Sequence, residues 1–161
     1  MPNQPPISPL GAFLKALDEE EIRCILVGMM AAVQQGAPFT TIDYDFWVDL
    51  PERQYIRILA IVRRLGGTIM ARTFFELSDG LQVNVVFKPT GLRSFNAEYS
   101  GSVESELEGQ LLRVLPLDRV IASKKAAGRD KDLATLPVLE RTLRLARRRK
   151  RQAPLKRRKR R

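Results

Sequence analysis

Residues 25–45 read Ile25-Leu-Val-Gly28-Met-Met-Ala-Ala-Val-Gln-Gln-Gly36-Ala-Pro-Phe-Thr-Thr41-Ile-Asp43-Tyr-Asp45. The stretch opens with an apolar run that ends at Gly28, a pattern typical of a strand followed by a tight turn. Small residues then predict a short helix that Gly36 ends. From residue 42 onward Ile, Tyr, Phe and Val alternate with Asp, Asp, Trp and Asp, and this period of two predicts a second strand.

The second strand places two acidic side chains on one face. Because side chains alternate across a strand, Asp43 and Asp45 point the same way, and their oxygens could share one hard cation or two neighbouring ones. An isolated Asp-x-Asp pair more often lines a solvated face of a sheet. On the pair alone, that interpretation stays open.

The rest of the chain mixes helices with strands linked by hairpins, which predicts an α+β fold with a mixed sheet. Residues 68–77 and 81–87 are rich in branched and aromatic side chains and flank a Ser-Asp-Gly turn, so they predict one hairpin. Residues 103–107 and 110–115 predict a more polar hairpin at a sheet edge. Pro137 is placed to open a last helix.

The ordered pattern of strand, glycine turn, small-residue helix, threonine and Asp-x-Asp resembles the opening of the nucleotidyltransferase superfamily. A second segment continues the likeness. Lys124 followed by Arg129-Asp-Lys-Asp132 is similar to the Lys-then-Arg-x-Lys-Asp segment of minimal bacterial members and abortive-infection toxins. The resemblance covers about residues 22–140 and implies a nucleotidyltransferase-like mixed sheet packed with helices.

The resemblance also implies roles for individual residues. The turn glycine of the family approaches the nucleotide phosphates, the two acids hold Mg²⁺ or Mn²⁺, and the later lysine supports the triphosphate. Oxygen-bound cations of this kind align an attacking hydroxyl and a leaving pyrophosphate without any histidine. The implied metal ligands are Asp43 and Asp45, and the implied nucleotide-binding residues are Gly28, Met29, Thr41 and Lys124.

Two positions depart from the family pattern. Met29 stands where a second Gly or Ser is usual, so it offers phosphate no hydroxyl. Asn84 stands where a third Asp completes the catalytic set with Asp43 and Asp45, and an amide is not a base, although its carbonyl oxygen can bind Mg²⁺. Glu76 could replace the missing carboxylate if the hairpin turn has three residues, whereas a two-residue turn would put it on the other face.

The charge of the chain is very unevenly placed. Residues 141–161 carry 13 Lys or Arg and no acids, whereas residues 1–140 carry 15 basic and 18 acidic side chains. Such a basic run cannot form a core and binds nucleic-acid backbones by releasing counterions. We therefore expect one domain over residues 1–146, and a basic, disordered tail over residues 147–161 that binds nucleic acid, RNA above all.

Rare residue types restrict the chemistry and the compartment. The chain has no histidine, which excludes a Ser-His-Asp triad and every zinc site that relies on imidazole. Its one cysteine, Cys24, sits in an apolar run, which favours a reducing compartment. No stretch approaches the ~18 apolar residues that span a bilayer. We expect a cytoplasmic protein that has no contact with membranes.

Two functions are consistent with these patterns. The first is a metal-dependent nucleotidyltransferase that transfers a nucleoside monophosphate from a nucleoside triphosphate to RNA or protein. The second is a catalytically reduced binding module of the same fold, one half of a toxin and antitoxin pair with a protein partner. Asn84 and Met29 favour the second function, whereas the paired acids favour the first.

Overall fold

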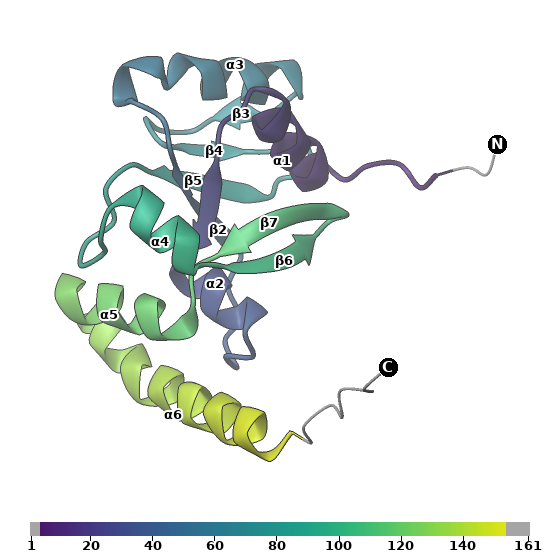
Figure 1. Ribbon diagram of the computed structural model, residues 1–161. Coiled ribbons are helices and arrows are strands. Elements are labelled where there is room, and N and C mark those ends of the chain that lie inside the picture. The colour runs from purple at the N-terminus through teal and green to yellow at the C-terminus, as the bar shows by residue number, and fades with distance from the viewer. Residues whose placement is uncertain (1–3, 154–161) are drawn as a thin grey trace.

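The computed structural model describes residues 4–153, which form an α+β fold around one mixed sheet of seven strands (Figure 1). The strand order is β3-β4-β5-β2-β1-β7-β6, in which β5 pairs parallel with β2, and β1 pairs parallel with β7. The other pairs are antiparallel. The strands are β1 (Cys24–Val27), β2 (Asp43–Val48), β3 (Thr68–Ile69), β4 (Phe74–Glu76), β5 (Gln82–Val86), β6 (Val103–Leu107) and β7 (Gln110–Val114).

Helices cover both faces of the sheet. On one face Phe13 of α1 packs against Phe46 of β2 and Phe75 of β4. The other face carries Asp45 and Trp47 and is met by α4, whose Phe95 contacts the Trp47 ring edge-on. The helices are α1 (Pro9–Glu19), α2 (Gly28–Gln34), α3 (Ile56–Arg64), α4 (Phe95–Gly101), α5 (Leu117–Ala127) and α6 (Asp130–Gln152), with a short 3₁₀ turn at Glu52–Gln54.

The predicted hairpin over residues 68–87 is wrong in one respect. Residues 68–77 form two strands, β3 and β4, that pair with each other, because the backbone turns at Ala71 and Phe74. The turn between β4 and β5 has the three-residue form, and it places Glu76 opposite Gln82. Glu76 therefore lies on the same sheet face as Asn84, as required if it were to replace a third acid.

Helix α4 was not predicted. Ser94 caps it by accepting a hydrogen bond at 3.2 Å from the backbone N–H of Ala97, which is a usual helix start. Inside the helix, the carboxylate of Glu98 is fully buried between two arginines, with Nε of Arg93 at 2.6 Å and Nε of Arg119 at 3.1 Å. Glu98 therefore ties α4 to the first turn of α5.

The last helix begins earlier than predicted. Pro137 lies inside α6 and does not open it, although a proline in a helix interior costs about 3 kcal/mol. Burial of Leu136 and Leu139 and the contacts of Asp132 in the first turn offset that cost. At its other end, α6 continues to Gln152, past the predicted domain boundary at residue 146, and residues 154–161 of the predicted tail lie outside the described residues.

Within residues 4–153, no helix combines the length and the apolar character that crossing a membrane requires.

Candidate functional site

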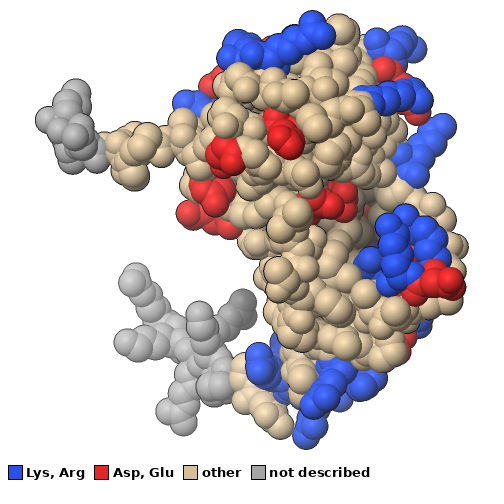
Figure 2. All heavy atoms as spheres, turned by 180° about the vertical axis from the view of Figure 1, so that it is seen from behind, with Lys and Arg blue, Asp and Glu red and all other residues tan. Residues whose placement is uncertain are grey.

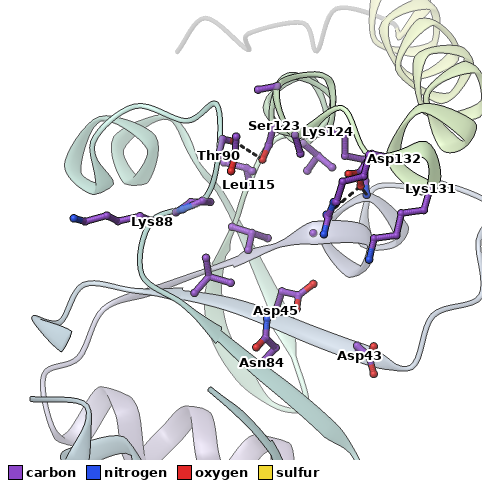
Figure 3. Close-up of a pocket in the computed structure, with 18 of the residues that line it drawn as sticks. Asp43, Asp45, Asn84, Lys88, Thr90, Leu115, Ser123, Lys124, Lys131 and Asp132 are labelled. Carbon is purple, nitrogen blue, oxygen red and sulfur yellow. Dashed lines mark hydrogen bonds and ion pairs between the residues drawn. The ribbon is translucent and has the colours of Figure 1, made fainter. Parts of the chain in front are cut away.

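The candidate site is an open pocket of about 720 Å³ on the Asp45 face of the sheet, bounded by α5 and the start of α6 (Figure 3). Its base is formed by two central strands that run parallel, so that Asp43 of β2 lies beside Gln82 of β5, and Asp45 beside Asn84. The pairing brings together residues that are 39 positions apart in the chain. The predicted trio of Asp43, Asp45 and Asn84 therefore lines one pocket.

Gly28 fits this site for a steric reason. It is the first residue of α2 and adopts φ +69°, a left-handed conformation that side chains disfavour. A Cβ atom at this position would collide with Oδ2 of Asp45. The missing side chain is what allows the Asp45 carboxylate to lie against the backbone at the start of α2.

The surroundings of Asp45 disfavour the negatively charged form of its side chain. Burial raises the pKa of Asp45, and repulsion from Asp43 raises it further, whereas the hydrogen bond from Asn84 and the positive charges of Lys124 and Lys131 lower it. Asp43 is exposed at the pocket mouth. A divalent cation between the two carboxylates would relieve the repulsion that raises this pKa.

The amide of Asn84 is already engaged. Its Nδ2 donates to Oδ1 of Asp45 at 3.2 Å, and its Oδ1 accepts from the hydroxyl of Thr73 at 3.1 Å. The carbonyl oxygen that could bind a cation therefore points to Thr73, and the amide nitrogen is hydrogen-bonded to one carboxylate oxygen of Asp45. In this arrangement both ends of the Asn84 amide are hydrogen-bonded within the protein, and its oxygen keeps one lone pair that the bond from Thr73 does not use.

A buried carboxylate organises the cations on the opposite side of the pocket. The Asp132 side chain is 2% exposed and accepts from Nε of Arg129 at 2.6 Å and from Nζ of Lys124 at 3.3 Å. The hydrogen bond from Arg129 lowers the pKa of Asp132, and Lys124 lowers it further, against burial, which raises it. Lys124, the predicted triphosphate ligand, is thus held by an ion pair.

Lys131 is a site residue that was not predicted. It is exposed, it lines the pocket, and it extends from the start of α6 toward the strands that carry Asp43 and Asp45 (Figure 3). It forms no ion pair with any residue from 4 to 153. Lys131 belongs to the Arg129-Asp-Lys-Asp132 segment that carries part of the family resemblance, but among the lysines the resemblance implied a role for Lys124 alone.

Three other predicted positions lie outside the pocket lining. Met29 packs against the hydrophobic core, and Thr41 is partly buried in the loop before β2. Glu76 shares the sheet face of Asn84 but sits one strand further from Asp43. Among the described residues, no group of three or more acids, cysteines or histidines is close enough to hold a metal ion. The nucleotide-binding roles of Met29 and Thr41 stay predictions.

The donor chemistry fits a hard divalent cation. Asp43 and Asp45 supply carboxylate oxygens, the ligands that Mg²⁺ and Mn²⁺ prefer, and Mg²⁺ is commonly bound through one or two carboxylates plus substrate phosphates. The facing cations suit the phosphates of such a ligand. The pocket therefore has the composition of a site for a metal-bound phosphate compound.

Comparison with known proteins identifies the fold. No family model and no curated sequence matches the chain. Among solved structures, the antibiotic-resistance factor ANT(2'')-Ia in solution has 16% identity and a TM-score of 0.54 over 90% of each chain. Its crystal structure with adenylyl-2''-tobramycin has 18% identity and a TM-score of 0.53, over 89% of this chain and 97% of that one.

A protein of Thermotoga maritima assigned to the nucleotidyltransferases has 20% identity and a TM-score of 0.52, over 80% of this chain and 88% of its own. At these identities the likeness concerns the fold. The chain has the nucleotidyltransferase fold, which confirms the predicted α+β class and the resemblance seen in residues 25–45.

Proposed function

We propose that the chain is a metal-dependent nucleotidyltransferase that transfers a nucleoside monophosphate from a nucleoside triphosphate to RNA or protein, with RNA favoured by the basic C-terminus. One observation carries the proposal. Asp43 and Asp45 share a face of β2, Asp45 rests against the side-chain-free backbone of Gly28, and both acids face Lys131 and Lys124 across the pocket. A triphosphate bridging the two sides would meet metal-binding oxygens at one end and cations at the other.

The residues divide the chemistry between them. Asp43 and Asp45 would hold Mg²⁺ or Mn²⁺, which supplies charge neutralisation and alignment of the reacting oxygens when bound. Lys131 offsets the negative charge that develops on the leaving pyrophosphate, and Lys124 assists from its ion pair with Asp132. Gly28 lets the nucleotide approach the backbone closely.

The direct test is transfer of label from each of the four nucleoside triphosphates, with Mg²⁺ or Mn²⁺, to a panel of acceptors. The panel holds total RNA, a general protein acceptor and tobramycin, because the structural neighbour ANT(2'')-Ia binds adenylyl-2''-tobramycin. We expect transfer to RNA. Transfer to no acceptor, despite measurable binding of metal and nucleotide, would favour the alternative function.

That alternative is a catalytically reduced binding module of the same fold, and the contacts of Asn84 favour it. Because Asn84 is an amide, held by Asp45 and Thr73, the site has two carboxylates where catalysis benefits from a third that could deprotonate the acceptor. Such a module would bind metal and nucleotide without transferring a nucleoside monophosphate to any acceptor. A toxin and antitoxin pair is one setting for it.

Lys131→Ala should weaken binding of the magnesium complex of ATP about tenfold, a loss of about 1.4 kcal/mol, because an unpaired cation is lost at the phosphates. Its melting temperature should stay that of the wild type. Lys124→Ala should instead lower the melting temperature by about 3–6 °C, because it removes a hydrogen bond to the buried Asp132 carboxylate. Calorimetric titration and thermal melts measure the two effects, and the reverse pattern would assign the phosphates to Lys124.

Deletion of Gln152 to Arg161 should weaken RNA binding and flatten its salt dependence without unfolding the domain. The segment carries six Lys or Arg, so the slope of log affinity against log salt should fall by up to about 4. The matched control keeps the length and replaces those six residues by Gln. An unchanged slope in both variants would exclude the segment as the RNA contact.

A further inference from the structure

A second hollow lies at the C-terminal end of α2, whereas the pocket described above includes Gly28 at its N-terminal end. The hollow has a volume of about 470 Å³ and runs between α6 and the turn that follows α2. Val138, Thr142 and Leu145 of α6 form one wall, at the spacing of one helix face. Residues 35–38 form the other wall, and their backbone bonds back to α2, with the N–H of Ala37 on the carbonyl of Ala32 at 3.0 Å. The groove is therefore preformed.

The uncharged polar side chains that line this groove are already hydrogen-bonded within the protein. Gln35 donates to the carbonyls of Ala31 at 2.9 Å and Leu115 at 2.8 Å, and its oxygen accepts from the N–H of Leu117 at 3.0 Å. The hydroxyl of Thr142 donates to the carbonyl of Val138 at 2.8 Å. Between them lies apolar surface, including Leu145, which is 43% exposed.

The rim of the groove is positive. Arg141 and Arg149 line it, and neither forms an ion pair with a residue between positions 4 and 153. The nearby acid on the helix, Glu140, is paired with Lys125 at 2.9 Å. Lys and Arg also gather on the surface around this end of α6 (Figure 2). The groove thus combines an apolar floor with unpaired guanidinium groups at its edge.

We propose that this groove binds an acidic amphipathic helix of a partner protein, whose apolar side chains cover Val138 and Leu145 and whose carboxylates pair with Arg141 and Arg149. Helices commonly bind in such grooves through apolar residues spaced three and four apart. A nucleic-acid backbone would satisfy the arginines, but it would leave the two apolar side chains in water. The exposed Leu145 therefore favours a helix over a phosphate chain.

A synthetic probe tests this binding directly. A labelled peptide of about 18 residues, long enough to form an isolated helix, carries leucines spaced four and three apart among glutamates and alanines. A scrambled peptide of the same composition and a labelled RNA oligonucleotide are the comparison ligands. We expect the full chain to bind the ordered peptide at least tenfold more tightly than the scrambled one, as measured by fluorescence anisotropy.

Variants on two faces of α6 separate the contacts. Val138→Ser with Leu145→Ser, and Arg141→Gln with Arg149→Gln, should each weaken the ordered peptide tenfold or more. The matched controls lie outside the groove lining: Leu133→Ser for the exposed apolar side chain, and Arg144→Gln with Arg148→Gln for the same loss of charge. Thermal melts verify that every variant is folded.

The proposal would be overturned if the ordered peptide did not bind, or if the scrambled peptide bound equally well. It would also be overturned if the groove arginine variant and the control arginine variant lost the same affinity while the double serine variant lost none. Retained RNA binding in the serine pair, together with lost peptide binding, would support it. Peptide binding at this groove needs neither metal nor nucleotide. Its failure therefore leaves the proposed transfer reaction untouched.

Discussion

Asp43→Asn combined with Asp45→Asn should reduce nucleotide transfer at least a thousandfold and abolish the stabilisation of the protein by Mg²⁺ or Mn²⁺. Amides keep the size of the side chains but remove both negative charges that hold the cation. For the wild type, metal at a hundred times its dissociation constant should stabilise the fold by about 2.7 kcal/mol, or about 5–10 °C in melting temperature. The variant should show no such shift.

Without metal, the same double variant should melt at or above the wild-type temperature. Burial and the charge of Asp43 raise the pKa of Asp45, so the ionised pair costs stability that the amides do not. For the same reason, Asp45 takes up a proton at a higher pH than an ordinary carboxyl, and metal stabilisation should be lost from that higher pH downward. Asp118→Asn, an exposed acid outside the pocket, is the control. Equal metal shifts in the wild type and the double variant would exclude the site.

Asn84→Asp should tighten Mg²⁺ binding about tenfold or more, because it adds a third carboxylate beside Asp45 with no change in size. Thr73 can still donate to the new carboxylate, as it does to the amide now. Without metal the variant should be less stable by about 1–2 kcal/mol, because Asp45 exchanges a hydrogen-bond donor for a like charge. Calorimetry with Mg²⁺ and thermal melts measure both changes.

The transfer assay on Asn84→Asp separates the two candidate functions. If the rest of the site is complete, the third carboxylate should create or raise transfer, because it can accept the proton of the acceptor hydroxyl. A reduced site would gain metal affinity alone. Asn96→Asp adds the same charge beside Arg23, away from the pocket, and should change neither property. Unchanged metal affinity in Asn84→Asp would show that this position lies outside the metal site.

Local patterns in the sequence were sufficient to predict most of the sheet and the shared face of its two central acids. The period of two around Asp43 and Asp45 put both acids on one face, whereas the face of Glu76 depended on the length of the turn after Leu77, which the sequence left open. What local patterns could not give was the parallel register that sets Asp45 beside Asn84, since that pairing joins distant segments. The direction of the Asn84 amide also depends on Thr73, which no periodicity connects to it.

The cationic half of the site was harder to predict, because it depends on how two helices meet. The resemblance implied Lys124 as the phosphate ligand, and Lys131 was not predicted. Buried Asp132 distinguishes them, since it binds Lys124 at 3.3 Å and leaves Lys131 without an ion pair among the described residues. Burial of an acid is a tertiary property. Helix α4 is different, because its start depends on a local capping signal, Ser94, that the sequence itself contains.

The parallel pairing of β2 with β5, and of β1 with β7, has a consequence for how the site comes into being during folding. The hairpins β4–β5 and β6–β7 join segments that are close in the chain. By contrast, β1 can pair with β7 only after Arg113, the partner of Ile25, is available. Contacts between distant segments form slowly, because closing the long loop between them costs conformational entropy before the strand pairing contributes any stabilisation. Because synthesis runs from the N-terminus, a growing chain also contains Asp43 and Asp45 well before it contains Lys131. Competence to bind a phosphate compound should appear only with the final cooperative folding step, and no fragment that ends before Lys131 should hold the site.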